Sequence, residues 1–162
     1  MNEVYYYETK VVQNKFKNPG SELRVGTLYL PDTDADEIIV QSPQEFKGPH
    51  SANGKSIYMT PEHLFVGSVV VCTFTTCVSI AENSKLEYKD IVVTGKGKLE
   101  SLPEGSGQWF SQIDVNLKFK IFKESDMKKA EAVAEKTKKN CLVANSMKST
   151  INFTFNIEVV SE

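Results

Sequence analysis

Hydrophobic and polar residues alternate most regularly in residues 108–122, which predicts a β-strand with one buried and one solvated face. The apolar positions of one parity are Trp109, Ile113, Val115, Leu117, Phe119 and Ile121. Residues 150–160 repeat the alternation, with Ile151, Phe153, Phe155, Ile157 and Val159 on one side. Weaker patterns predict strands at residues 4–13, 22–30, 37–41 and 88–100. The chain therefore contains several strands.

Two segments have helical spacing instead. Residues 126–140 repeat apolar side chains at helical intervals, and their last turn carries lysines that suit the negative end of the helix dipole. Residues 60–83 begin with a good N-cap, Thr60, followed by Pro61 at the first helical position and Glu62 in the first turn. Together with the strands, the two helices predict an α+β fold.

The first helix carries an unusual apolar run, because residues 64–81 contain no charged side chain. This length is at the short limit for a membrane span, and glycine, serine and threonine dilute the run, so we expect no membrane partner. A helix that is apolar all round is normally buried. In a chain of this size, such a helix needs cover from a second subunit, which predicts an intimate homodimer.

The overall composition narrows the function. With 162 residues, the chain has the size of one domain over residues 1–162. The formal net charge is -2, so the basic surface that nucleic acid or anionic lipid requires is missing and we expect no nucleic-acid partner. The first ten residues contain an early acid and no cationic segment before an apolar run, which favours a cytoplasmic location.

Three cysteines, Cys72, Cys77 and Cys141, cannot all pair within one chain. In a reducing cytoplasm, a disulfide between two of them would be part of the chemistry and not a scaffold. There is no CxxC motif, and His50 and His63 have no metal-binding spacing, so we expect neither a metal nor another cofactor.

The candidate chemistry lies on the first helix. Glu62, Phe65, Val69 and Cys72 follow one another at intervals of three and four residues, so they fall roughly on one helix face. Ten residues separate the carboxylate from the thiol by roughly 15 Å along the axis, too far for contact. Either a long cation bridges them or a partner subunit supplies one of them. The single arginine, Arg24, has a permanently charged guanidinium that can bind a carboxylate and lie beside a thiolate.

Three segments resemble the OsmC/Ohr family, the osmotically inducible and organic hydroperoxide resistance proteins. They are IIVQSPQEFKGP at residues 38–49, TPEHLFVGSVVVC at residues 60–72 and KKNCLVANSMKSTINFTF at residues 138–155. The resemblance extends from about residue 20 to the C-terminus. It implies an OsmC-like α+β fold, with antiparallel sheets wrapped on a long buried central helix in an interlocked homodimer.

The resemblance also implies a function, a thiol-dependent peroxidase that reduces organic hydroperoxides to alcohols. Cys72 would be the peroxidatic cysteine, Cys141 would resolve its sulfenic acid as an intramolecular disulfide, and Arg24 and Glu62 would activate the thiolate. A dithiol or a lipoylated protein would reduce the disulfide. The substrate pocket would be lined by the apolar side chains Phe65, Val69 and Phe74.

Two other classes stay open for the same fold. One is a non-catalytic protein that binds a hydrophobic small molecule at the dimer interface. The other is a redox sensor, in which the same disulfide changes the affinity for a partner. Turnover with a dithiol distinguishes the sensor from the peroxidase, because a sensor cycles slowly.

Overall fold

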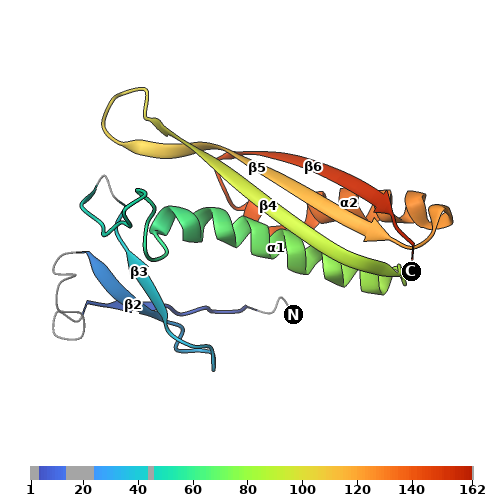
Figure 1. Cartoon of the computed structure of the whole chain (residues 1–162), viewed down its shortest axis with the longest axis horizontal. Coiled ribbons are helices and arrows are strands. Elements are labelled where there is room, and N and C mark those ends of the chain that lie inside the picture. The colour runs from blue at the N-terminus through green and yellow to red at the C-terminus, as the bar shows by residue number, and fades with distance from the viewer. Residues whose placement is uncertain (1–3, 14–23, 44–45, 162) are drawn as a thin grey trace. The chain divides into compact units, whose positions relative to one another are not determined.

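The computed structural model describes residues 4–13, 24–43 and 46–161, and it divides into two compact units, Met1–Leu64 and Phe65–Glu162. In the first unit, strands β1 (Lys10–Val12), β2 (Val25–Tyr29) and β3 (Ile38–Gln41) form an antiparallel sheet in the order β1-β2-β3. Figure 1 shows β2 in blue and β3 in cyan. The single domain expected over residues 1–162 stays a prediction.

The second unit contains strands β4 (Tyr88–Ser101), β5 (Gln108–Ile121) and β6 (Thr150–Val159), which form a second sheet in that order. A short 3-10 turn η2 (Glu124–Asp126), helix α2 (Met127–Asn140) and helix α3 (Leu142–Asn145) connect β5 to β6. Helix α1 (Pro61–Asn83) begins in the first unit, and most of its length belongs to the second. The fold class is therefore α+β, as predicted.

The second sheet is mixed. β4 and β5 form an antiparallel hairpin, whereas β5 and β6 pair in parallel from Gln112 with Thr150 to Ile121 with Val159. A parallel pair needs a crossover connection, and the α2 and α3 segment supplies it. The expectation of purely antiparallel sheets was wrong for this pair, because it did not consider the path of the chain through α2.

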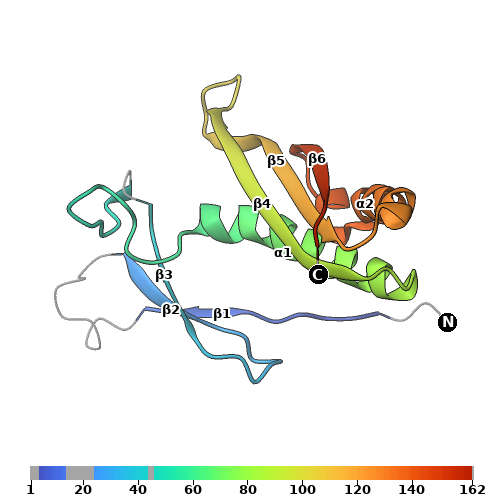
Figure 2. The same cartoon turned by 45° about the vertical axis from the view of Figure 1, so that its right-hand side comes forward.

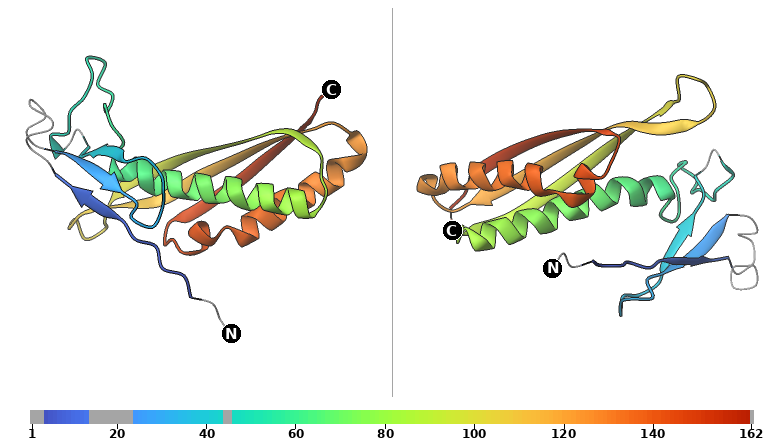
Figure 3. Two further views of the ribbon diagram at one scale, coloured as in Figure 1. Left: turned by 90° about the horizontal axis from the view of Figure 1, so that it is seen from below. Right: turned by 180° about the vertical axis from the view of Figure 1, so that it is seen from behind.

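The core of the second unit lies between this sheet and its helices. Figure 3 shows α1 and α2 on the same face of the sheet. The inward side chains of β5 are at most 1% exposed, and they are Ile113, Val115, Leu117, Phe119 and Ile121. Cys77 and Ala81 of α1 share one buried cluster with Ala130 and Val133 of α2. The alternation in the sequence predicted this buried face correctly from Ile113 to Ile121, whereas Trp109, assigned to the same face, is 38% exposed.

Helix α1 is buried along one stripe only. Val69, Thr73, Cys77 and Ala81, four residues apart, are at most 1% exposed, whereas Val71 on another side is 61% exposed. In the single chain α1 is covered along this stripe, and the cover expected from a second subunit stays a prediction. By length and composition alone, α1 could also cross a membrane, but the core helix of a globular unit meets the same criteria.

Two glycines of β4 let α1 approach the sheet closely. A Cβ atom on Gly95 would meet Val70 at 2.5 Å, and one on Gly97 would meet Phe110 at 2.6 Å and Val66 at 2.7 Å. Real Cβ atoms do not approach other atoms so closely, so a side chain at either position would push α1 away. Figure 2 shows α1 running beneath β4.

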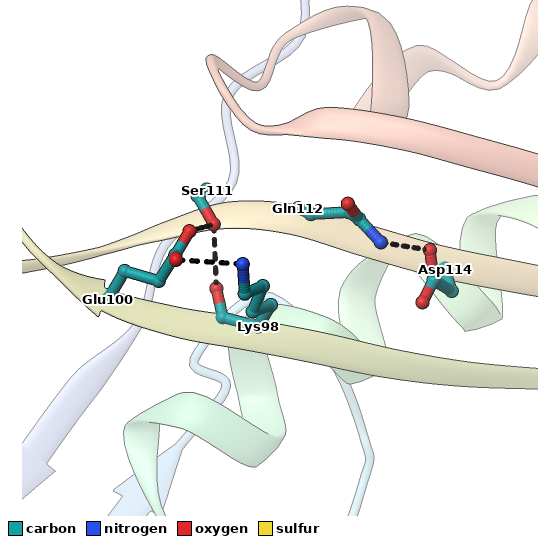
Figure 4. Close-up of polar contacts among 5 residues, drawn as sticks. All are labelled: Lys98, Glu100, Ser111, Gln112 and Asp114. Carbon is teal, nitrogen blue, oxygen red and sulfur yellow. Dashed lines mark hydrogen bonds and ion pairs between the residues drawn. The ribbon is translucent and has the colours of Figure 1, made fainter.

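The strand pair β4 and β5 also carries a polar cluster, shown in Figure 4. The Lys98 ammonium lies 2.7 Å from the Glu100 carboxylate, which also accepts a hydrogen bond from Ser111. These contacts lower the pKa of Glu100, and the hydrogen bond from Lys98 has the largest effect. Gln112 donates to Asp114 at 2.6 Å. The cluster satisfies polar groups at the register shift between Lys98 and Leu99.

The predicted elements agree with the observed ones to within a few residues for the long segments. The strands expected at 108–122, 150–160 and 88–100 are β5, β6 and β4, and the helices expected at 60–83 and 126–140 are α1 and α2. The weak strand at 4–13 is only three residues long, and residues 22 and 23 of the next one lie outside the described residues. The short helix α3 was not predicted.

Candidate active site

Cys141 stands at the junction between α2 and α3. Helix α2 ends at Asn140, Cys141 adopts an extended conformation with φ -68° and ψ 103°, and α3 begins at Leu142. The Asn145 side chain donates to the Lys139 carbonyl at 3.0 Å, which ties α3 back to the end of α2. Because the first N–H groups of a helix have no partner within it, this turn presents free donors beside Cys141.

A shared hydrophobic cluster holds this turn next to α1. Val69 of α1, one turn before Cys72, is fully buried against Ile113 and Val115 of β5. Val143 and Ala144 of α3 pack partly buried against the same cluster. The packing of both helices on β5 therefore brings Cys72 and Cys141 together.

The Cys72 thiol is half-buried and surrounded by hydrogen-bond donors. Burial raises its pKa, but this effect is outweighed by donors, of which the backbone N–H of Val143 is the strongest. The pKa of Cys72 is lowered further by the thiol of Cys141, the hydroxyl of Thr76 and the backbone N–H of Leu142. Thr76 Oγ1 lies 4.0 Å from the Cys72 sulfur, one helical turn further along α1. The net result is a pKa lowered from the ordinary value, which favours the nucleophilic thiolate.

Cys141 has the opposite character. It is 2% exposed, and burial raises the pKa of its thiol. The backbone N–H of Ala144 and the hydroxyl of Thr73 lower the pKa, whereas the hydrogen bond that its thiol donates to Cys72 raises it, and the net direction is upward. Cys72 is thus the more acidic thiol of the pair and Cys141 the less acidic one.

Cys77 does not belong to this pair. It is fully buried in the core between α1 and α2, and burial raises the pKa of its thiol against a weaker effect of the Thr137 hydroxyl. All three cysteines are free thiols. A buried thiol with a raised pKa is a small hydrophobic side chain with low reactivity.

Glu62 lies in the first turn of α1, where a carboxylate suits the helix dipole. Thr60 and His63 cap this end, because Thr60 Oγ1 lies 2.8 Å from His63 Nδ1 and the His63 N–H reaches Thr60 Oγ1 at 3.5 Å. Glu62 Oε2 is buried and has no hydrogen-bond partner among the described residues. A buried carboxylate oxygen without a donor is costly, so this oxygen calls for a donor other than the described residues of one chain.

Arg24 immediately precedes β2 and is exposed. It lines a hollow of the first unit together with Gln41 and the apolar residues Val11, Leu28 and Leu64. The described ion pairs do not include one between Arg24 and Glu62. The structure therefore does not bring the arginine and the carboxylate together within one chain.

The expected substrate face of α1 needs a correction. Val69 is fully buried in the core, while Phe65 is 37% exposed and stacks on Phe110 with ring centroids 5.0 Å apart. Phe74 is 43% exposed, and nine residues correspond to two and a half helical turns, so Phe65 and Phe74 leave α1 on opposite sides. The three side chains do not share one face, because the spacing of the last one was misjudged.

Within the part of the chain that the structure describes, no three His, Cys, Asp or Glu side chains gather into a group that could hold a metal ion. The chemistry that the site offers is that of an activated thiol beside a second thiol. Sequence reasoning missed its supporting donors, Thr76, Thr73 and the N–H groups of residues 142 and 143. Of these, only Thr76 had a signal, because it stands four residues after Cys72 on a predicted helix.

The α+β unit carries a cysteine of lowered pKa on its long helix α1 and a buried second cysteine between α2 and α3. This arrangement is typical of proteins with thiol chemistry. The family model for OsmC-like proteins matches residues 52–156, which is more than half of the chain. The protein therefore belongs to the OsmC-like protein family. A search of curated proteins gives no significant match.

Several solved structures share this fold over nearly their whole length. An OsmC-like protein of unknown function from Vibrio cholerae is similar with a TM-score of 0.75 and 16% identity, over 94% of this chain and 100% of that one. An organic hydroperoxide resistance protein from Elizabethkingia anophelis gives a TM-score of 0.67 at 18% identity, with 99% and 100% covered. One from Legionella pneumophila gives 0.63 at 20% identity, with 98% and 100% covered. At these identities, the likeness establishes the fold.

Proposed function

We propose that this protein is a thiol-dependent peroxidase that reduces organic hydroperoxides to alcohols. Cys72 is the peroxidatic cysteine and Cys141 the resolving cysteine. The observation that carries the proposal is the pair itself: the two thiols lie close enough to affect each other's pKa, the pKa of Cys72 is lowered and the pKa of Cys141 is raised. Membership of the OsmC-like family, whose solved relatives include proteins named for organic hydroperoxide resistance, supports it.

The reaction balances in two steps. The Cys72 thiolate attacks the distal oxygen of ROOH, the O–O bond breaks, and the alkoxide leaves and takes a proton to become ROH. Cys72 is now a sulfenic acid. The sulfur of Cys141 then attacks the sulfenic sulfur, hydroxide leaves and takes the Cys141 proton as water, and a disulfide remains. An external dithiol or a lipoylated protein reduces it by thiol exchange.

Glu62 and Arg24 complete the site in a homodimer. The buried, unpartnered Oε2 of Glu62 requires a donor, and the forked guanidinium of Arg24 is suited to a carboxylate. The exposed apolar side chains of α1, Phe65, Val71 and Phe74, require cover that a second subunit supplies. An active site on so apolar a helix favours an alkyl hydroperoxide over hydrogen peroxide. The location of the protein is expected to be the cytoplasm.

The test is turnover. Reduced protein is mixed with cumene hydroperoxide and dihydrolipoamide, and peroxide consumption is measured against hydrogen peroxide in a parallel series. We expect catalytic consumption that is faster with the organic peroxide. Consumption no faster than with Cys72→Ser would refute the assignment, and slow cycling with the dithiol after the first turnover would indicate a redox sensor instead.

One observation favours a second candidate, a non-catalytic protein that binds a hydrophobic small molecule. The hollow of the first unit has apolar walls that include Val11, Leu28 and Leu64, and its polar side chains are Gln13, Arg24, Gln41 and Ser42. This combination is typical of a ligand site. If it is the function, ligand affinity is unchanged by Cys72→Ser and no peroxide is consumed.

A further inference from the structure

Thr73 is a fully buried polar residue on an otherwise apolar helix. It lies directly after Cys72 and is 1% exposed. Its hydroxyl is 3.6 Å from the sulfur of Cys141, and this is the one hydrogen bond that it makes among the described residues. The hydroxyl is therefore directed at the second thiol of the pair.

Three other helical hydroxyls of this unit behave differently, whereas Thr76 contacts the other thiol, that of Cys72, at 4.0 Å. Ser68 donates to the Phe65 carbonyl at 2.7 Å, and Thr137 to the Val133 carbonyl at 2.8 Å. Thr75, two residues after Thr73, donates to a helix carbonyl at 3.1 Å. This backbone contact is the usual way in which a helical serine or threonine satisfies its hydroxyl. Thr73 departs from it in favour of a thiol.

Packing alone does not call for a threonine here. Valine has the same branched shape without the hydroxyl, and α1 already uses valine at positions 69, 70 and 71. Burying a hydroxyl costs free energy unless it makes a hydrogen bond, and a thiol is a weak partner. A buried threonine at this position therefore serves Cys141, not the core.

We propose that Thr73 is a positioning residue, whose hydroxyl holds the Cys141 sulfur beside Cys72 and so promotes closure of the disulfide. The proposal rests on the proposed peroxidase function for its biological meaning. It concerns the second step only, in which the Cys141 sulfur displaces hydroxide from the sulfenic acid of Cys72 and water leaves. Thr73 takes no part in the first step, because its hydroxyl contacts Cys141 and not Cys72.

The direction of the pKa effect agrees with this geometry. The Thr73 hydroxyl lowers the pKa of Cys141, against the larger effect of burial. Loss of the hydroxyl leaves Cys141 less well oriented and less acidic. Both changes slow the attack on the sulfenic acid, and neither touches the donors around Cys72.

The experiment compares Thr73→Val, which removes the hydroxyl, with Thr73→Ser, which restores it, and uses Thr75→Val as the matched control on the same helix. Reduced protein is mixed with one equivalent of cumene hydroperoxide and quenched at intervals. Mass spectrometry then follows the loss of the Cys72 thiol, the dimedone-trapped sulfenic acid and the Cys72 to Cys141 disulfide.

In Thr73→Val we expect loss of the Cys72 thiol at the wild-type rate and disulfide closure roughly threefold to tenfold slower, the factor that one weak net hydrogen bond supplies. Sulfenic acid accumulates, and with excess peroxide the sulfinic acid of Cys72 increases. In Thr73→Ser and Thr75→Val, the disulfide forms at nearly the wild-type rate. Closure of Thr73→Val at the wild-type rate overturns the proposal, and so does equal slowing of both steps.

Failure of the proposed function is distinguishable from failure of the inference. If wild-type protein forms no disulfide with peroxide, the peroxidase assignment fails. The thiol pair is then closed with diamide, an oxidant that needs no peroxide chemistry, and the same three variants are compared. Slower diamide closure in Thr73→Val alone still supports the positioning role, and equal closure in all variants refutes it.

Discussion

The two units differ in how far each has arranged the residues proposed for function, the thiol pair in the second unit and the charged pair in the first. In the second unit, the two thiols face each other, Cys141 is buried, and hydrogen bonds already lower the pKa of Cys72. In the first unit, Glu62 has a buried oxygen without a partner among the described residues, and Arg24 is exposed beside a hollow. The thiol pair is assembled by one chain, whereas the charged pair is not.

This difference separates two contributions to reactivity. The donors around Cys72 come from Thr76 and from the first turn of α3, so they act without Arg24. We propose that Arg24, held by Glu62, instead stabilises the negative charge that develops as the O–O bond breaks, a task that needs substrate in place. Thiolate formation and peroxide cleavage are therefore expected to respond to different substitutions.

The largest effect is expected at the thiol pair. Cys72→Ser removes the nucleophile, so peroxide consumption falls to the background rate of buffer alone. Cys141→Ser keeps the first step and loses the second, so Cys72 proceeds to sulfinic acid. Peroxide assays combined with intact mass spectrometry measure both. Cys77→Ala, at the cysteine outside the pair, is the control, and loss of turnover there would contradict the assignment of the pair.

The packing of the second unit is tested next. Gly97→Ala places a Cβ against Phe110 and Val66, and we expect a loss of about 1 to 3 kcal/mol in the free energy of unfolding. Urea unfolding measures it. Gly67→Ala on α1 is the matched control, because a Cβ there meets nothing within 4 Å and alanine favours a helix by roughly 0.5 to 1 kcal/mol. Equal stability of the two variants would contradict the close approach of β4 to α1.

The charged pair is expected to matter less than the thiols. Glu62→Gln and Arg24→Lys should each slow peroxide cleavage about tenfold, which corresponds to ~1.4 kcal/mol, because the forked contact of the guanidinium with the carboxylate is lost. The double variant should be no slower than either single one if the two groups act as a unit. Alkylation of Cys72 by iodoacetamide across pH should stay unchanged in each variant. A shifted alkylation profile would show that Arg24 also sets the Cys72 pKa.

The smallest effect is expected from pH. The pKa of Cys72 is lowered and the pKa of Cys141 is raised, so on going from alkaline to mildly acidic pH the Cys72 thiolate persists longer than the Cys141 thiolate. Sulfenic acid formation should therefore decline less than disulfide closure, and the yield of sulfinic acid should rise severalfold as pH falls. Quenched-flow mass spectrometry at several pH values checks this. A parallel decline of both steps would mean that Cys141 does not limit closure.

The long elements of the fold could be predicted from the sequence because each has a clear period. The alternation in β5 and the capping residues before α1 were sufficient to define both elements. The parallel pairing of β5 with β6 could not be predicted, since it depends on where the chain returns after α2. The four-residue helix α3 has no periodic signal at all.

Of the site, the two cysteines and Glu62 were found through the spacing on α1 and the family resemblance. The donors to Cys72 were not, because backbone N–H groups leave no trace in side-chain composition, and Thr73 resembles any other apolar-helix threonine in sequence. The burial of Val69 follows from the packing of α1 on β5, which the spacing alone did not resolve. The opposite orientations of Phe65 and Phe74 follow from their nine-residue spacing, which was misjudged. The long-range packing of α1 on β5 therefore determines which of its positions are buried, and the local sequence pattern does not predict this.

One measurement tests the central claim most directly, that Cys72 and Cys141 are a reactive pair within one chain. Reduced protein receives one equivalent of cumene hydroperoxide, is digested under conditions that block thiol exchange, and the disulfide is located by mass spectrometry. The account predicts a rapid Cys72 to Cys141 bond with Cys77 still a thiol. Survival of both thiols, or a disulfide that includes Cys77, would contradict it.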